Sequence, residues 1–164
     1  MIGGGDFGSA RLVPDAMRAA ADGGVLMLRN PGAIRPWQHV LNPLSGYLVL
    51  AERLWDERDY ASGWNFGPDD RDARPVRWIV ERLVESWGDG LGWEFDGRPQ
   101  PPEAQYLKLD SSRAHSRLGW LPRWDLAEGL DRTVEWFRGY RDGADVREVT
   151  AAQIEAFERA PVEA

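Results

Sequence analysis

The chain has 164 residues, of which 43% are hydrophobic and 29% charged, and its formal net charge is −7. A chain of this length buries roughly two-thirds of its unfolded surface, which supports one domain without disulfides. Cysteine is absent, so disulfides and thiolate metal sites are excluded and a cytoplasmic setting is favoured. The acidic balance argues against a nucleic-acid surface, although Lys108 is the only lysine among 20 basic residues, and the arginines leave room for local anion sites.

No segment predicts a membrane anchor. The longest apolar run, Leu44–Leu54, is interrupted by Ser45, Gly46 and Glu52, and it falls short of the roughly 18 residues that a membrane-spanning helix requires. A secretory signal is not predicted either, because Met1 leads straight into glycines. We therefore expect neither a membrane nor a nucleic acid as partner.

The chain begins with a predicted helix and two extended segments. Residues 9–22 place apolar side chains on one face and stop at Gly23, which predicts a helix with Pro14 in its first turn. Val25–Leu28 is a short apolar run between turn residues and predicts a strand. A second extended piece is expected at Arg35–Val40.

A long helix and a short strand are predicted next. Asn42 and Pro43 suit the N-cap and the first turn of a helix that continues to about Glu57. Gly63–Phe66 then predicts a strand. The helical spacing indicates a buried stripe formed by Leu44, Tyr47, Leu48, Ala51, Leu54 and Trp55.

The middle of the chain predicts a helix between short strands. Apolar residues at helical spacing indicate a helix over Pro75–Trp87, with an acidic loop, residues 69–72, in front of it. Gly92–Phe95 and Tyr106–Leu109 predict strands on either side of a proline-rich loop, Arg98–Ala104.

The last third of the chain is predicted to be helical. Asp110 is expected to cap a short helix over Ser112–Leu118, and Asp125–Tyr140 predicts a longer one. A terminal helix is expected over Thr150–Ala160, after a weakly structured connection over Asp142–Val149. The fold class is therefore α/β, a small helix-rich module whose strands are too few for a doubly wound sheet.

Three glycines near the start imitate a cofactor-binding turn. Gly3, Gly5 and Gly8 match the G-x-G-x-x-G spacing, and a predicted helix follows them. A dinucleotide turn also needs a preceding strand, so that the pyrophosphate reaches the helix N-terminus, and here only Met1 and Ile2 precede the glycines. We interpret this segment as a glycine-rich start of the chain, with an anion-binding loop or the end of a strand as alternatives.

The segment RNPGAIRPWQHV, residues 29–40, is the best candidate for ligand contact. Arg29 and Arg35, with Arg11 upstream, could present guanidinium groups to a diphosphate, and Trp37 could fix their direction. The alternative is that these arginines pair with some of the 27 acidic residues on the surface. For His39, a half-buried structural histidine is favoured over a general base.

The sequence contains no recognisable catalytic set. A base of the short-chain reductase type needs a tyrosine four residues before a lysine, whereas Ala104 stands four residues before Lys108. There is also no G-x-S-x-G elbow, no H-E-x-x-H motif and no P-loop. No catalytic residue, metal ligand or cofactor-binding residue is therefore predicted.

Five sequence blocks follow one another in a distinctive order: IGGGDF, RLVPDAMRAA, RNPGAIRPWQHVLNPLSGYLVLAERL, WNFGPDD and EAQYLKLDSSRAHSRLGWLPRWDLAEGLDRTVEW. In this order they resemble the C-terminal part of CDP-glucose 4,6-dehydratases, members of the extended short-chain dehydrogenase/reductase superfamily. The resemblance covers residues 2–157, and RNPGAIRPWQHV together with LGWLPRW is its most specific part. It implies the substrate-binding domain of such an enzyme without the Rossmann sheet.

The resemblance also implies a nucleotide-sugar site. The segment around Arg35 and Trp37 would lie against the diphosphate. The loop containing Glu103 and ending at Tyr106 would close over the nucleoside. Relatives tend to carry a histidine before that acid, whereas Pro102 stands here, so the preference for cytosine is in doubt. Further residues that would line the nucleotide site are Arg11, Leu12 and Pro14.

The resemblance finally implies that cofactor binding and substrate binding belong to different domains. The family uses NAD to oxidise the sugar, and its cofactor loop and Tyr-x-x-x-Lys base lie in an N-terminal domain, so this chain alone is expected to bind no cofactor. Residues 1–8 would be the end of that domain, 9–145 the substrate-binding domain, and 146–164 a C-terminal helix and tail.

Three hypotheses follow: an inactive substrate-binding part, half of a split dehydratase that needs a separate NAD-binding chain, or an interaction module with a vestigial site. We also expect self-association through uncovered apolar surface at residues 9–22 or 25–40.

Overall fold

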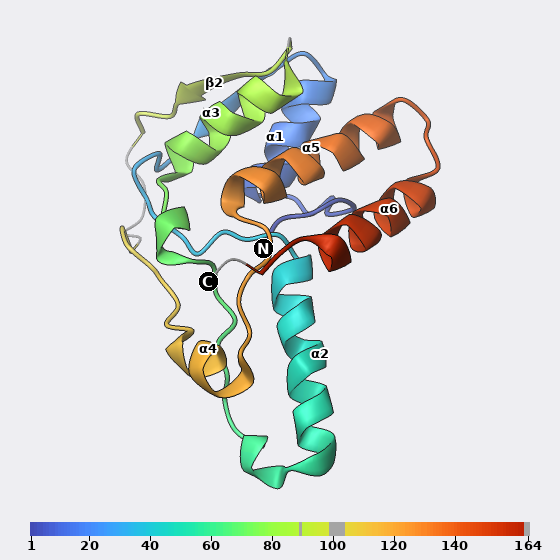
Figure 1. The fold of residues 1–164 in the computed structure, drawn as a ribbon. Coiled ribbons are helices and arrows are strands. Elements are labelled where there is room, and N and C mark those ends of the chain that lie inside the picture. Colours follow the sequence, from blue (N-terminus) through green and yellow to red (C-terminus); the bar gives the residue numbers. More distant parts are fainter. Residues whose placement is uncertain (89, 99–103, 163–164) are drawn as a thin grey trace.

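The structure is a computed structural model that describes residues 1–88, 90–98 and 104–162. Six α-helices and one two-stranded parallel sheet are found in this part of the chain (Figure 1). The expected class, a helix-rich α/β module with short strands, is confirmed. The helices are α1 (Leu12–Ala21), α2 (Leu41–Asp56), α3 (Val76–Trp87), α4 (Ser112–Leu118), α5 (Leu126–Arg141) and α6 (Val146–Arg159). The strands are β1 (Val25–Leu28) and β2 (Gly92–Phe95), and the 3-10 turns are η1 (Arg58–Tyr60) and η2 (Asp70–Asp72).

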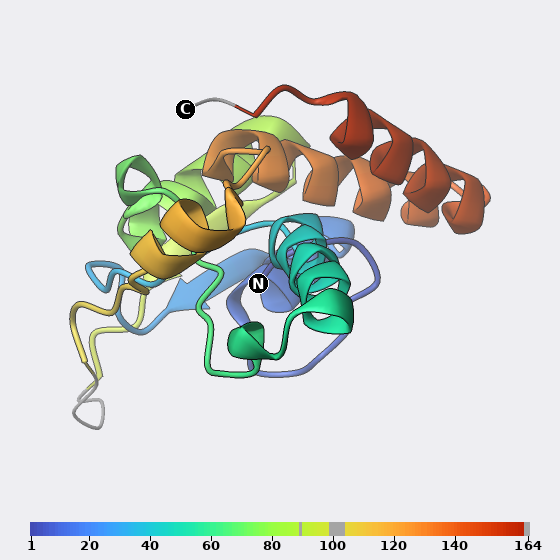
Figure 2. The same ribbon diagram turned by 60° about the horizontal axis from the view of Figure 1, so that its bottom comes forward.

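The main hydrophobic core lies where α1, α3 and α5 meet beneath β1. The helices predicted over Pro75–Trp87 and Asp125–Tyr140 are confirmed, and α3 and α5 carry most of the fully buried side chains. In Figures 1 and 2, α6 runs back along α5 and covers the outer side of this body. The largest fully buried hydrophobic side chains are Ile79, Val80, Leu83, Leu126, Leu130 and Val134.

The sheet joins two strands that are far apart in the sequence. β1 pairs with β2 in parallel, from Val25 opposite Gly92 to Leu28 opposite Phe95. Both strands were predicted with these bounds. The pairing places residues that follow β2 beside residues that follow β1, because parallel strands end at the same edge of a sheet.

Three other segments predicted to be extended form no strand in the structure. Arg35–Val40 contributes only a single parallel bridge, between His39 and Ile2, because Pro36 has no N–H to donate and the Trp37 N–H turns back to the Arg35 carbonyl. Tyr106–Leu109 likewise contributes one bridge, at Tyr106. In Gly63–Phe66, the Phe66 carbonyl accepts from the Gln38 side chain instead of from a strand.

Aspartates cap the N-termini of two α-helices, α5 and α6. The Asp125 carboxylate accepts from the Glu128 N–H at the start of α5. Asp110 was predicted to cap α4, but the N-cap is Ser111, and Asp110, one residue earlier, accepts from the Ser112 N–H. The predicted terminal helix is confirmed, but its predicted start was wrong. α6 begins at Val146 and not at Thr150, because Asp145 caps it by accepting from the Arg147 N–H, so Asp142–Val149 is not a loose connection throughout.

The predicted buried stripe of α2 was also wrong. The large side chains of that stripe are exposed, and the helix instead buries Asn42, Pro43 and Gly46. A Cβ at Gly46 would overlap the Phe66 ring, so the missing side chain is what allows α2 to lie with this face inward. Asn42 is not the N-cap either, since that position is Val40.

The apolar surface expected on residues 9–22 is not found there. α1 buries Val13, Ala16, Met17 and Ala20 in the core. In the segment 25–40, Val25 and Met27 do remain half exposed on the outer face of β1. The largest exposed apolar side chains of a single helix lie on α2, which points away from the body of the molecule in Figure 1.

Candidate functional site

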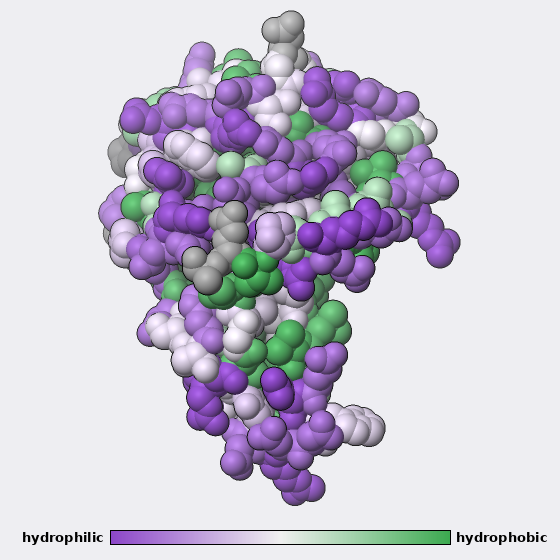
Figure 3. Space-filling model, in the orientation of Figure 1, coloured by the Kyte–Doolittle hydropathy of each residue, from purple (hydrophilic) through white to green (hydrophobic). Residues whose placement is uncertain are grey.

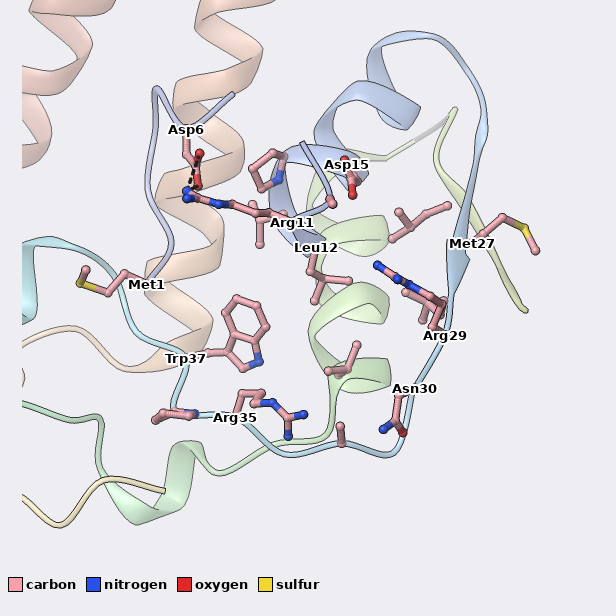
Figure 4. A pocket seen from close by; sticks show the side chains of 18 of the residues that line it. Met1, Asp6, Arg11, Leu12, Asp15, Met27, Arg29, Asn30, Arg35 and Trp37 are labelled. Carbon is pink, nitrogen blue, oxygen red and sulfur yellow. Dashed lines mark hydrogen bonds and ion pairs between the residues drawn. The ribbon is translucent and has the colours of Figure 1, made fainter. Parts of the chain in front are cut away.

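A cavity of about 1250 Å³ lies between the first turn of α1, the end of β1 and residues 33–37 (Figure 4). It opens at the carboxyl edge of the parallel sheet, which is where open α/β folds bind their ligands. Its size is sufficient for a nucleotide with an attached sugar. Four arginines line it: Arg11, Arg29, Arg35 and Arg98.

Arg11 is held at one side of the cavity by an acidic partner. Its guanidinium donates to both carboxylate oxygens of Asp6, at 3.1 and 3.2 Å, as the dashed lines in Figure 4 show. The Gly8 N–H and then this arginine lower the pKa of Asp6, so the carboxylate stays ionised. An incoming anion at this position would therefore compete with Asp6 for Arg11.

Two further arginines follow the two strands. Arg29 comes directly after β1, and in Figure 4 its side chain extends toward Leu12. Asp96 comes directly after β2, where its N–H donates to the Leu28 carbonyl at 2.8 Å. Two hydrogen bonds from the Arg98 guanidinium hold the pKa of the Asp96 carboxyl below its ordinary value. The strand pairing thus brings Arg29 and Arg98 to one edge of the cavity.

Arg35 and Trp37 approach the cavity from the opposite wall. The Arg35 guanidinium donates to the Ile34 carbonyl at 2.9 Å, and the Trp37 N–H donates to the Arg35 carbonyl at 2.8 Å. In Figure 4 both side chains point into the cavity. Within the described residues, the buried indole N–H of Trp37 has no hydrogen-bond partner, so it is a donor available to a ligand.

The third wall is the N-terminus of α1. Leu12, Val13 and Pro14 are its first residues and line the cavity, and the N-cap residue Arg11 makes no capping hydrogen bond with its side chain. The first N–H groups of a helix lack partners within the helix and attract anions. The cavity therefore combines a helix N-terminus with guanidinium groups, a set suited to a phosphate or diphosphate.

Most of the residues predicted for ligand contact converge on this cavity. Tyr106 is an exception: it is exposed and pairs with Ile34, while its neighbour Gln105 lines the cavity. Glu103 lies outside the described residues, as does most of the predicted Arg98–Ala104 loop. The predicted residues that line the cavity are Arg11, Leu12, Pro14, Arg29, Arg35 and Trp37.

Sequence reasoning missed Arg98, Asn30 and Gln105 as cavity residues. Arg98 could have been found only by predicting that β2 pairs with β1 in parallel. Asn30 stands next to Arg29 in the sequence and was treated as part of a turn. Nothing in the local pattern around Gln105 indicates that it reaches the cavity.

The glycine-rich start does not fit a dinucleotide. A Cβ at Gly4 would overlap the indole ring of Trp136, so this glycine serves close packing against α5. Phe7 also contacts Trp136, with ring centroids 6.2 Å apart. The space beside the Gly4 Cα is therefore filled by an aromatic side chain.

His39 is a structural residue. It is only 2% exposed, its ring lies 5.0 Å from that of Trp124, and its Nδ1 accepts from the Leu41 N–H at 3.3 Å. Burial lowers the pKa of His39 to about 4, and the charge of Arg132 adds to the effect. The neutral ring is part of the packing around the start of α2.

We expect acid to destabilise the fold through His39. In the unfolded chain the residue takes up a proton near pH 6.5, whereas the folded ring with a pKa of about 4 does not, so stability is full above pH 6.5 and declines toward pH 4. The loss should reach about 2 kcal/mol at pH 5. Urea denaturation at pH 7 and at pH 5 measures the difference in the free energy of unfolding between the two pH values. His39→Gln is the control, and in this variant that difference should be smaller by about 2 kcal/mol. The same difference in both proteins would contradict a neutral buried ring.

The described part of the chain holds neither a membrane-spanning helix nor a cluster of metal ligands. No helix there is long and apolar enough to cross a membrane. No group of three or more His, Asp or Glu side chains is placed there to hold a metal ion.

The chain is similar in sequence to enzymes that are more than twice as long. No protein-family model matches the chain. The CDP-glucose 4,6-dehydratase of Salmonella typhimurium is 50% identical over 147 residues, which are 89% of this chain and 41% of the relative. A dTDP-glucose 4,6-dehydratase of Streptomyces griseus is 27% identical, over 80% of this chain and 38% of the relative. The chain thus spans about two-fifths of the length of these relatives.

Solved structures establish the fold. RMD from Pseudomonas aeruginosa, complexed with NADPH, has a TM-score of 0.69 at 19% identity and is matched over 85% of this chain and 45% of its own. DesIV, a dTDP-glucose 4,6-dehydratase from Streptomyces venezuelae with NAD and TYD bound, has a TM-score of 0.63 at 23% identity, over 82% and 40%. The fold is therefore that of part of an extended short-chain dehydrogenase/reductase. Within that class, the chain is similar in sequence to a C-terminal portion of a CDP-glucose 4,6-dehydratase, at 50% identity.

Proposed function

We propose that this chain binds the nucleotide-sugar substrate of a sugar-nucleotide 4,6-dehydratase, with CDP-glucose as the first candidate ligand. The observation that carries the proposal is the convergence of four arginines and the N-terminus of α1 on one cavity. A diphosphate matches this set because each guanidinium offers paired donors and the helix end offers N–H groups. The base and the sugar would occupy the remaining volume, beside Trp37.

The similarity to the Salmonella enzyme supports the choice of ligand. That relative is a CDP-glucose 4,6-dehydratase, and a match over 147 of the 164 residues includes Arg35 and Trp37. The chemistry of dehydration is not assigned to these residues, because the sequence has no tyrosine four positions before Lys108. NAD and the base would come from the part of the relatives that this chain does not span.

The proposal predicts that Arg35→Ala weakens the binding of CDP-glucose by roughly tenfold to a hundredfold. A charge-assisted hydrogen bond contributes about 1.5–3 kcal/mol, which corresponds to that range of affinity. Isothermal titration calorimetry with CDP-glucose and with CDP measures the change. Arg77→Ala is the matched control, since Arg77 lies on α3, pairs with Glu81 at 3.6 Å and does not line the cavity.

Two results would contradict the proposal. The first is unchanged affinity of the Arg35→Ala protein for CDP-glucose. The second is the absence of binding heat for the wild-type chain with both ligands at millimolar concentration. Titration with dTDP-glucose in parallel tests the preference for the base, because the Streptomyces relatives are dTDP-glucose 4,6-dehydratases.

If the chain is half of a split enzyme, a second measurement applies. Adding the N-terminal portion of a CDP-glucose 4,6-dehydratase should then restore conversion of CDP-glucose to the 4-keto-6-deoxy sugar. Persistent inactivity of a verified complex would exclude this alternative.

A further inference from the structure

The cavity contains an ion pair of its own. Polar and charged side chains cover much of the face seen in Figure 3, so an ion pair is common on this surface. The pair between Asp6 and Arg11 differs because both residues line the cavity, together with three further arginines. Asp6 therefore places a negative charge inside a site whose guanidinium groups suit a negatively charged ligand.

One nitrogen of Arg11 makes both bonds to the carboxylate. Its Nη1 donates to Oδ1 of Asp6 at 3.2 Å and to Oδ2 at 3.1 Å. In the pair of Arg98 with Asp96, Nε and Nη2 each donate to a separate oxygen at 2.8 Å, which is the two-pronged geometry of a strong guanidinium–carboxylate pair. Arg11 thus holds Asp6 by the weaker arrangement. A phosphate that accepts from two nitrogens of Arg11 would bind it in the stronger one.

The backbone around Gly8 is shaped to hold this pair. The Gly8 N–H donates to Oδ1 of Asp6 at 3.0 Å, and a Cβ on Gly8 would lie only 3.0 Å from Cδ of Arg11. Glycine at this position therefore leaves room for both side chains. Ala10 has a φ of 58°, and it is the one non-glycine residue with a positive φ in the described chain. This conformation is costly for alanine, so the packing of the surrounding loop imposes it.

Asp6 is the anchored partner of the pair, and Arg11 is the movable one. The Arg18 guanidinium donates to the carbonyls of Phe7 and Gly8, at 3.1 and 3.2 Å, which ties the segment after Asp6 to α1. The Phe7 ring also packs against three aromatic rings of α5, at centroid distances of 5.2, 5.6 and 6.2 Å. The Arg11 side chain is 66% exposed, compared with 33% for Asp6. An exposed arginine can change its rotamer, and with it its partner, while the backbone stays in place.

We propose that Asp6 is an internal competitor for Arg11. The Asp6 carboxylate and a phosphate of the ligand compete for the same guanidinium, and Arg11 passes from Asp6 to the phosphate on binding. The inference rests on the proposed anion site in the cavity and adds to it a residue that weakens the affinity and so speeds the release of the bound anion. The opposite role would be to orient Arg11 for the ligand, in which case removing the charge of Asp6 would weaken binding.

The test removes this charge by Asp6→Asn, which keeps the size of the side chain and an oxygen that can accept from the Gly8 N–H. Asp142→Asn is the matched control, since Asp142 also pairs with an arginine, Arg141 at 2.7 Å, and lies outside the described lining of the cavity. Both substitutions are also combined with Arg11→Ala, and far-UV circular dichroism checks that each variant keeps the wild-type fold. Isothermal titration calorimetry with inorganic pyrophosphate measures the affinity, because this probe needs neither the base nor the sugar.

The proposal predicts that pyrophosphate binds about threefold to fivefold more tightly to the Asp6→Asn protein than to the wild type, since an exposed ion pair no longer has to be broken. With Arg11→Ala present, the gain should fall below about twofold, because only screened repulsion between Asp6 and the ligand remains. Asp142→Asn should change the affinity by less than about 1.5-fold.

An unchanged or weaker affinity of the Asp6→Asn protein would overturn the proposal. An equal gain with and without Arg11 would also overturn it, because Asp6 would then act by repulsion alone. Absence of pyrophosphate binding in both the wild-type chain and the Asp6→Asn protein would overturn it together with the anion site. The proposed function fails separately: if pyrophosphate behaves as predicted but CDP-glucose binds no more tightly than pyrophosphate, the substrate assignment falls and the competition by Asp6 stands.

Discussion

Replacing Leu130 with alanine is expected to lower the free energy of unfolding by about 3 kcal/mol. Leu130 lies in the middle of α5, is fully buried, and belongs to the main core cluster together with Ile79 and Leu83 of α3. The substitution removes three carbon atoms from a site enclosed by two helices, which leaves a cavity that the surrounding side chains fill only in part. Urea denaturation followed by far-UV circular dichroism measures the loss.

The matched control is the same substitution at an exposed leucine. Leu48→Ala on α2 removes the same atoms from a side chain that is 68% exposed, so stability should change by less than about 0.5 kcal/mol. A loss below about 1 kcal/mol for Leu130→Ala, or equal losses at both positions, would show that α3 and α5 do not pack as described. The comparison thus tests the central helix pair and separates packing from helix propensity.

The elements predicted well from the sequence are those with one apolar face. Both α3 and α5 carry a single apolar stripe at helical spacing, so only one orientation buries it, and Leu83 and Leu130 in these stripes are fully buried. α2 is different, because it is apolar on two sides. The side that contains Gly46 faces the interior, because the missing side chain leaves room for the Phe66 ring. The spacing of apolar residues along the helix does not reveal this contact.

In the candidate site, too, some residues are predictable from local sequence and others are not. The pattern around Arg35 and Trp37 indicated an anion contact because charged, aromatic and turn residues stand close together in the sequence. The place of Arg98 depends on the pairing of β1 with β2, whose strands are more than 60 positions apart. No local pattern specifies such a register. The sequence therefore predicts one wall of the cavity, and tertiary pairing supplies the opposite edge.

The polar connection between α2 and the segment before α5 is another long-range feature, and it rests on Asn42. The side chain of this fully buried residue donates to the Trp124 carbonyl at 2.8 Å. Its Oδ1 accepts from the Arg123 N–H at 3.0 Å and from the Trp124 N–H at 3.3 Å. One side chain therefore satisfies three backbone groups that are separated from it by about 80 residues, so it fixes where α2 leaves the body of the molecule.

Asn42→Ala is expected to destabilise the fold by about 3 kcal/mol. The substitution leaves two N–H groups and one carbonyl buried without partners, and each unsatisfied group costs about 1–3 kcal/mol before the segment relaxes or water enters. Asn65→Ala is the matched control, because Asn65 is exposed and its side chain donates one hydrogen bond, to the Asp110 carbonyl at 3.1 Å. Urea denaturation of both variants should separate them by 2 kcal/mol or more, roughly the difference between buried and solvated groups. Similar stability of the two variants would mean that the backbone at Arg123 and Trp124 is not held by Asn42, and α2 would then lack its main polar anchor to the rest of the molecule.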